Sequence, residues 1–417
     1  MRRIFWRGPP GSLGFPLKRL RVINAMKADT PPPHKNRWSW RSQAFRGIVY
    51  QALALAVIAF VAWFLAHNTL LNMRERGIQS GFDFMLQSAG FDIGESLYPF
   101  DSEESYLSAF LVGVSNTLRV AVVGIVLSTL LGTLLGVGRF SRNALVRGLC
   151  VSYVEAFRNI PVLLQLLMWY VILTEVLPSS DAAWKLGDFF LSKGGLNFPI
   201  PVWAVGQLWA AIGLGLGVVG VLLYRRWARR QFEATGRLRS AFWVPVVILI
   251  ASSLAGWALG GAPTELNRPI RGEFSIEHGG ALTPEFLAVL IGLTLYTAAF
   301  IAEVVRGGIA SVPRGQGEAA SALGLSHQQE MRLVMLPQAL RVIIPPLTNQ
   351  YLNLTKNSSL AVAIGYPDVV SIANTALNQT GRAVECISIV MLVYLTTSLG
   401  TSLLMGWYNS RSAIKER

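Results

Sequence analysis

Apolar runs of about 20 residues dominate this sequence, and such runs restrict a chain to the few folds that a lipid bilayer accepts. Seven strong runs and one weaker one are candidate transmembrane helices. They cover residues 47–66, 118–137, 161–177, 202–224, 242–261, 285–305, 343–364 and 384–407. Because backbone groups in lipid must be hydrogen-bonded within the protein, the pattern predicts an all-α, polytopic membrane protein with about eight spans.

Three of these runs carry further local signals. The sixth run follows Thr283, a good N-cap residue, and opens with Pro284 and Glu285, which suit a first helical turn. In the third run, Pro161 marks either the start of the helix or a kink in a helix that begins near Val151. The seventh is the weakest run, because polar residues interrupt it: Asn349, Gln350, Asn353, Lys356 and Asn357.

The positive charge of the chain follows the predicted spans. The formal net charge is +14, an excess that would also suit nucleic-acid binding. However, basic residues collect in alternate loops, as they do on the cytoplasmic side of membrane proteins. Eleven Lys and Arg residues against Asp29 precede the first span, and seven acids against Arg74 and Arg76 follow it. We therefore predict that both termini are cytoplasmic and that nucleic acid is not a partner.

This alternation divides the chain into five parts. We expect a basic cytoplasmic segment over 1–46, a first span over 47–66, an acidic periplasmic loop over 67–106, a membrane domain over 107–411 and a cytoplasmic tail over 412–417. The sequence leaves open whether translation starts at Met1 or Met26, and where the seventh span ends.

Signatures of enzymes and of metal sites are missing from the sequence. The four histidines lie far apart, and both cysteines, Cys150 and Cys386, lie in apolar surroundings typical of helix packing. No GxxxxGK[ST] stretch occurs, so the chain cannot bind ATP through a P-loop. We expect no catalytic residues, no metal and no cofactor bound by this chain.

A polar stretch, EAASALGLSHQQEMRLVMLP, separates two of the spans on the cytoplasmic side. Its residues from Glu318 to Leu323 favour a helix, Gly324 supplies a turn with positive φ, and Ser326 can cap a second helix. Pro337 is expected to end or kink that second helix. The pattern predicts two short helices that form a cytoplasmic docking surface.

The same residues resemble a known family. Glu318, Ala319 and Ala320, then Gly324, then Leu336 and Pro337 match, in identity and spacing, the EAA loop of ABC importer membrane subunits, with Val334 where isoleucine is usual. Residues 116–141, 153–170, 300–320 and 344–369 look like the polar amino acid permeases. The acidic outer loop and the insert over 181–284 resemble the general L-amino-acid permease subgroup. The resemblance covers about residues 37–411.

This resemblance implies a type I ABC importer permease fold and a mechanism. The loop over about 315–337 would dock into an ATPase subunit through Glu318, Ala319, Ala320, Gly324, Leu336 and Pro337. The chain would be an inner-membrane subunit that imports L-amino acids with an ABC ATPase, a second homologous permease and a periplasmic amino-acid-binding protein. The sequence does not say which amino acids are carried, or whether this chain holds a substrate site.

Candidate pathway residues lie in the interrupted seventh span. Polar groups beside Pro345 and Pro346 can line a cavity, because broken backbone in lipid is tolerated only there. We name four candidates: Asn349, Asn353, Lys356 and Ser358. Packing against a partner subunit explains them equally well.

Two alternative functions remain at this point. The first is an ion-coupled secondary amino acid transporter, which would need coupling-ion acids in interrupted helices of both halves, and none stands out. The second is a regulatory or structural membrane protein, which the polar stretch near Pro345 disfavours. A neighbouring ATPase gene and a binding-protein gene would distinguish the importer from both.

Overall fold

The computed structural model describes residues 43–75, 80–235, 243–272 and 275–412, together with Trp40, Gly77 and Ser240. Nearly all of the predicted basic segment over 1–46 and of the tail over 412–417 lies outside the described residues. The chain divides into two units, residues 1–76 and 77–417. Helix α1 (Gln43–Glu75) belongs to the first unit and is 33 residues long, so it extends beyond both ends of the predicted first span.

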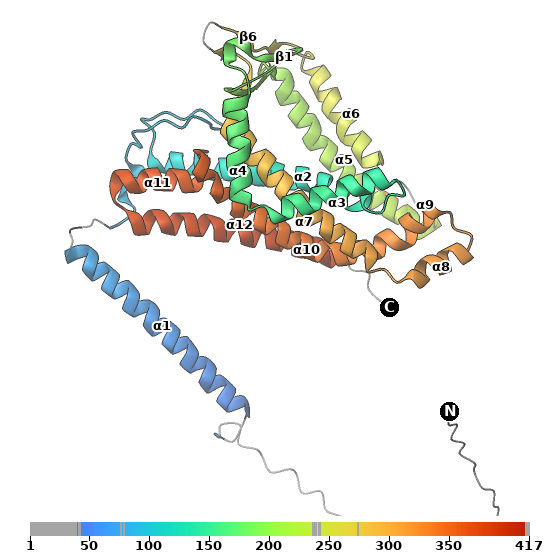
Figure 1. The fold of residues 1–417 in the computed structure, drawn as a ribbon, viewed down its shortest axis with the longest axis horizontal. Helices are drawn as coiled ribbons and strands as arrows, with labels where there is room; N and C mark the ends of the chain where they lie inside the picture. Colours follow the sequence, from blue (N-terminus) through green and yellow to red (C-terminus); the bar gives the residue numbers. More distant parts are fainter. Residues whose placement is uncertain are drawn as a thin grey trace, which may run out of the picture. The chain divides into compact units, whose positions relative to one another are not determined.

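Five described helices are long and apolar enough to cross a bilayer by themselves. They are α1, α2 (Tyr106–Gly138), α5 (Val205–Thr235), α7 (Pro284–Ala310) and α12 (Ala383–Ser412). Four of them contain a predicted apolar run, and α5 contains all but the first three residues of the run over 202–224. Figure 1 shows α2, α7 and α12 in one bundle of the second unit.

Two bent helix pairs would bring the number of spans to seven if each pair is one span, and one further apolar helix is short. Helix α3 (Ala144–Asn159) meets α4 (Val162–Val171, continued by a π-helical turn to Val176) at 104°. Helix α10 (Leu336–Asn357), continued by a 3-10 turn to Ile364, meets α11 (Val369–Thr380) at 50°. Helix α6 (Trp243–Leu259) is apolar but shorter. With these, each of the eight predicted runs has its helix.

The corner between α3 and α4 shows whether Pro161 starts a helix or kinks one that began near Val151. Ile160 and Pro161 are extended, with ψ of 129° and 135°, and Pro161 is the N-cap of α4. Proline disfavours helical geometry in the residue before it, which accounts for the break. A separate helix therefore precedes the third run, at a steep angle to it, as Figure 1 shows.

Of the two outcomes expected for Pro337, that it ends the second helix or kinks it, the first is wrong. A π-helical turn over Met331–Met335 leads into α10, and Pro337 lies in the first turn of α10, where a missing N–H costs little. The helix then runs on past Pro345 and Pro346. The seventh span thus begins before residue 343, and the polar loop is continuous with it.

Small antiparallel sheets connect α4, α5, α6 and α7, and the sequence analysis did not anticipate them. The four-stranded sheet has the order β1 (Trp184–Leu186), β2 (Phe189–Ser192), β3 (Gly195–Phe198), β8 (Gly280–Leu282). Two pairs complete the set: β4 (Ile200–Pro201) with β5 (Leu266–Asn267), and β6 (Ile270–Arg271) with β7 (Ile276–Glu277). β8 leads directly into α7, so the sheet fixes where that span begins.

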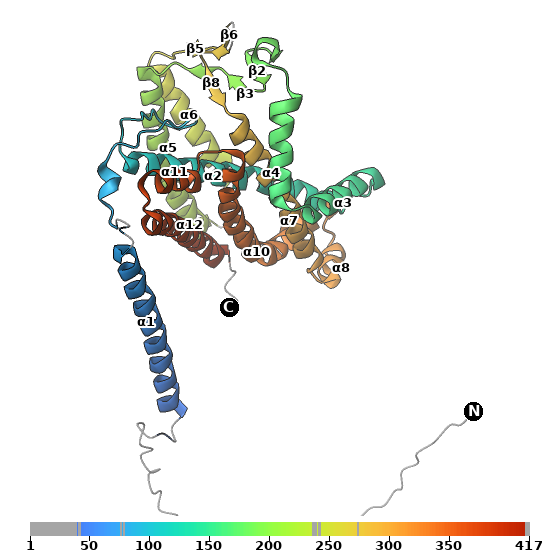
Figure 2. The same cartoon turned by 60° about the vertical axis from the view of Figure 1, so that its left-hand side comes forward.

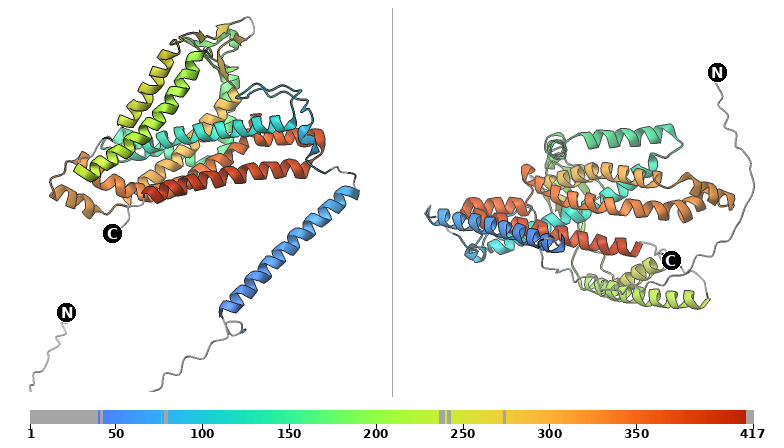
Figure 3. Two further views of the ribbon diagram at one scale, coloured as in Figure 1. Left: turned by 180° about the vertical axis from the view of Figure 1, so that it is seen from behind. Right: turned by 90° about the horizontal axis from the view of Figure 1, so that it is seen from below.

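Glycines allow close packing in two helix pairs, as their four-residue spacing predicts. In α2, a Cβ on Gly132 or Gly136 would lie 2.8 Å from the carbonyl oxygens of Ala298 and Ala302 in α7. In α5, Gly213 lies against the backbone of Ser252 in α6. Figure 3 shows α5 and α6 side by side.

Candidate coupling loop and outer pocket

The polar loop folds into a helical hairpin. Helix α8 (Arg314–Ala322) follows Pro313 and ends at Leu323, and Gly324 has the predicted positive φ, of +76°. The N–H of Gly324 donates to the Ser321 carbonyl, and the N–H of Leu325 donates to the Ala320 carbonyl, at 3.0 and 3.2 Å. This pair of bonds is the Schellman motif, which turns the chain sharply after a helix.

The return helix is capped as predicted. The Ser326 backbone N–H donates to Gln329 Oε1 at 2.9 Å, and the Gln329 N–H donates back to Ser326 Oγ at 3.4 Å. This reciprocal capping box fixes the start of α9 (His327–Glu330). Figure 2 shows α8 at the opposite end of the second unit from the strands.

The loop residues predicted to dock do not all face outward. Glu318, Ala319 and Gly324 are exposed, and the Leu323 side chain between them is 81% exposed. Ala320 is only 3% exposed, because α8 packs on the Met331–Met335 turn. A docked partner would therefore meet Glu318, Ala319 and Leu323, while Ala320 holds the hairpin together.

The hairpin is tied to the spans on both sides of it. One apolar cluster joins the end of α7 to the start of α10 across the base of the hairpin. Its buried members are Ile301, Val305, Val312, Ala339 and Ile343. Gln338 also donates from Nε2 to Gln316 Oε1 at 3.2 Å, and Leu336 and Pro337 lie at this base, partly exposed. The hairpin, α7 and α10 thus form one packed block.

Three of the four pathway candidates share one face of α10. Asn349, Asn353 and Lys356 are all exposed, and their spacing of four and three residues places them in one row. Ser358 does not join them. It is 1% exposed, and its hydroxyl donates to the Thr355 carbonyl at 2.7 Å.

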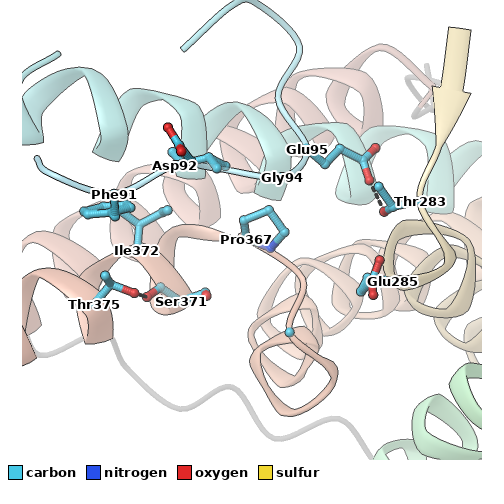
Figure 4. Close-up of a pocket in the computed structure, with 12 residues that line it drawn as sticks. Phe91, Asp92, Gly94, Glu95, Thr283, Glu285, Pro367, Ser371, Ile372 and Thr375 are labelled. Carbon is cyan, nitrogen blue, oxygen red and sulfur yellow. Dashed lines mark hydrogen bonds between the residues drawn. The ribbon is translucent and has the colours of Figure 1, made fainter. Parts of the chain in front are cut away.

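An outer pocket, which the sequence analysis missed, lies at the other end of the second unit. Its volume is about 350 Å³. Figure 4 shows lining side chains from three parts of the chain: the acidic loop, the start of α7, and α11 with the turn before it. The labelled acids and hydroxyls are Asp92, Glu95, Glu285, Thr283, Ser371 and Thr375.

Glu95 joins the acidic loop to two spans at this pocket. Arg119 of α2 lies 2.5 Å from it, measured from Nη1 to Oε1, and the Thr283 hydroxyl donates to its other oxygen. Thr283 also caps α7 as predicted, accepting from the Phe286 N–H at 3.2 Å. Burial raises the pKa of Glu95, while Thr283 and Arg119 oppose that rise.

A second contact fastens the start of the same loop. Arg382, 5% exposed, donates to the Gly81 carbonyl at 2.9 Å and pairs with Asp83 at 3.0 Å. Glu385 accepts from the Gly81 N–H at 2.7 Å. The sequence does show acids in this loop and arginines at the ends of spans. That pattern does not tell which acid pairs with which arginine.

Comparison with known proteins gives consistent matches. The family model described as binding-protein-dependent transport system inner membrane component matches residues 240–413. The general L-amino acid transport system permease protein AapQ of Rhizobium johnstonii is 45% identical over 394 residues, 93% of this chain and 98% of that protein. The amino-acid ABC transporter permease protein YhdX of Escherichia coli K12 is 44% identical over 386 residues, 92% and 98%.

A third relative extends the same pattern. The glutamate/glutamine/aspartate/asparagine transport system permease protein BztB of Rhodobacter capsulatus is 39% identical over 409 residues, 89% of this chain and 95% of that protein. Each of the three matches covers about nine-tenths of this chain.

Proposed function

Because this chain belongs to the inner-membrane permeases of binding-protein-dependent ABC transporters for amino acids, we propose that it forms part of the route by which L-amino acids enter the cell. It is a transport subunit of the inner membrane and not an enzyme, and it works with an ATPase and a binding protein. The 45% identity to a general L-amino acid permease over 93% of the chain is the observation that supports L-amino acids as the substrates. The relatives do not support an ion-coupled transporter.

The orientation that we propose places both termini and the α8–α9 hairpin in the cytoplasm. Arg225, Arg226, Arg229 and Arg230 near the end of α5 support it, because basic residues favour the inner side. The strands and the outer pocket then face the periplasm, where the binding protein delivers its ligand. The acids of the 80–105 loop fit that side.

We propose that the ATPase binds the outward face of the hairpin, and that ATP binds to that separate subunit. Glu318, Ala319 and Leu323 are its contacts, because they are exposed on one short helix. Buried Ala320 and the turn at Gly324 shape the hairpin, and Leu336 and Pro337 join it to α10. Exposed leucine beside small alanines suits a partner that approaches the helix closely.

The pathway in this proposal runs between this chain and a second, homologous permease. Asn349, Asn353 and Lys356 line its half, where amides and an ammonium group can meet the carboxylate and amine of an amino acid. A row of exposed polar groups would be costly against lipid, which supports a partner or a water-filled route on that face. Ser358 fixes the end of α10 rather than the route.

The test is transport by the purified complex in proteoliposomes. We expect uptake of labelled L-amino acids that requires the binding protein outside and ATP at the hairpin side. Single labelled amino acids, tested in turn, then define the substrate range. Uptake that follows a sodium or proton gradient without ATP would overturn the proposal, as would a complex that forms without a second permease.

A further inference from the structure

A carboxylate surrounded by arginines lies near the hairpin end of α7. Glu303 Oε2 is 2.5 Å from Arg139 Nη1 and 3.9 Å from Arg158 Nη1. Its Oε1 accepts from Arg306 Nε at 3.0 Å, and from the same guanidinium group through Nη2. One anion therefore meets three cations that come from three helices.

Each of the arginines marks a point where a helix ends or bends. Arg139 is the C-cap of α2. Arg158 lies in the last turn of α3, directly before the 104° corner with α4, and its guanidinium group lies over the Phe300 ring at 5.3 Å. Arg306 lies one turn after Glu303 in α7 itself. Glu303 thus joins the corner and the end of α2 to α7.

The same part of α7 packs against the base of the hairpin. Val305 and Ile301, on either side of Glu303, belong to the cluster that also holds Val312, Ala339 and Ile343. Gly308 packs directly on Ile343, with no room for a side chain between them. The end of α7 is thus packed on the base of the hairpin on one side and joined through Glu303 to the corner on the other.

The ionic contacts between the end of α2, the α3–α4 corner and α7 all depend on the charge of one residue, Glu303. The Glu303 side chain is 28% exposed and that of Arg139 is 14% exposed, so the contacts are partly shielded from water. Removing one partner of such a pair costs more than it does at an exposed site, because the remaining charge is left partly shielded without a partner. Without the carboxylate, three guanidinium groups would face one another, and the corner would lose its ionic attachment to α7.

We propose that Glu303 is a positioning residue, which transmits movement of the hairpin to the α3–α4 corner and so couples ATP hydrolysis to transport. This inference rests on the proposed docking of the ATPase at the hairpin. It goes beyond that proposal because it names the α3–α4 corner as the part of the membrane domain that responds to movement of the hairpin.

The test measures uptake and ATP hydrolysis in the same proteoliposomes, and compares the number of amino acids moved per ATP. For Glu303→Gln we expect ATP hydrolysis to continue, with at least a tenfold fall in amino acids moved per ATP. Glu303→Asp, which keeps the carboxylate among the three arginines, should retain a large part of the ratio. Glu233→Gln, which breaks the exposed Arg229–Glu233 pair on α5, is the control and should change nothing.

The possible outcomes separate the two proposals. If the wild-type complex shows no ATP-dependent uptake, the proposed function fails. If the wild type couples normally and Glu303→Gln keeps the same ratio, only the role of Glu303 is overturned. Should Glu303→Gln fail to assemble, Arg158→Gln removes only the contact to the corner, and an unchanged ratio in that variant overturns the inference.

Discussion

Arg119 and Glu95 form a salt bridge that fastens the acidic outer loop to α2, with 2.5 Å between Nη1 and Oε1. Their side chains are 17% and 6% exposed, and the Phe286 ring lies 4.0 Å from the guanidinium group. Asn116 adds a bond to the Glu95 carbonyl at 2.8 Å. The loop is therefore a packed part of the outer surface and not a free linker.

Removing the cation from this pair should destabilise the protein. We expect Arg119→Met to lower the free energy of unfolding by about 3 kcal/mol, because Glu95 would stay buried without its partner. The double variant Arg119→Met/Glu95→Gln should regain most of that loss, since it leaves no buried charge. Thermal unfolding of the purified protein in detergent measures both effects.

The exposed acid Glu103, in the same loop, provides the matched control. Glu103→Gln should shift the unfolding temperature very little. If the double variant proved as unstable as Arg119→Met alone, charge would not be the cause, and lost packing of the arginine on Phe286 would explain the result instead.

Acid should stabilise the wild type relative to Glu95→Gln. Burial raises the pKa of Glu95 above its ordinary value of 4.5, so the folded state holds the proton more tightly than the unfolded state. Its contribution to stability is then fully present below the unfolded pKa and is lost as pH rises through the folded pKa. The difference in unfolding temperature between the two proteins should therefore grow in favour of wild type as pH falls from about 7 to about 5. A difference that shrinks would contradict the direction of the pKa shift.

The sequence predicted those features that depend on neighbouring residues. Apolar runs gave the spans, since length and composition suffice for a helix in lipid. Thr283 caps α7 and Gly324 takes a positive φ because each role is decided within a few residues. The α8–α9 hairpin was predicted for the same reason, down to the cap at Ser326.

Features that depend on distant residues were not predictable. Glu303 meets Arg139 across 164 positions, and no local pattern selects that partner. The inward position of Ala320 and Ser358 depends on how each helix is rotated, which its neighbours in space decide. Strands of two to four residues, such as β4 and β8, are too short to leave an alternating pattern.

Changing Gly324 should separate ATP hydrolysis from uptake. Its φ of +76° is inaccessible to proline, whose ring holds φ near −65°, so Gly324→Pro must reshape the turn between α8 and α9. We expect the complex to insert in the membrane and to lose most ATP-dependent uptake. Gly324→Ala, with nothing within 4 Å of its added Cβ, should cost only about 1 kcal/mol and keep uptake. Normal uptake by the proline variant would show that the hairpin is not needed to couple ATP hydrolysis to uptake.

Lys356 should matter for transport and Ser358 should not. Lys356 is exposed beside Asn353 on the proposed pathway face, and its ammonium group can hold a substrate carboxylate in passage. We expect Lys356→Met to lower the rate of amino acid uptake at least fivefold, about 1 kcal/mol, with little change in the amount of assembled complex. Ser358→Ala removes one bond within the helix and should leave uptake nearly unchanged. Equal effects of both variants would argue for helix packing instead of a pathway.

Gly136 should be intolerant of any side chain, because α2 and α7 touch there. A Cβ at this position would lie 2.8 Å from the Ala302 carbonyl oxygen and 2.8 Å from the Val305 Cβ, so valine forces the two helices apart. We expect Gly136→Val to cost at least about 2 kcal/mol of stability and to displace Glu303, the next residue after Ala302, from Arg139. Gly215→Val is the matched control on α5, where an added Cβ meets nothing within 4 Å. The unfolding temperature and the yield of folded protein compare the two, and equal losses would show that valine is unfavourable in any of these helices, whatever the packing.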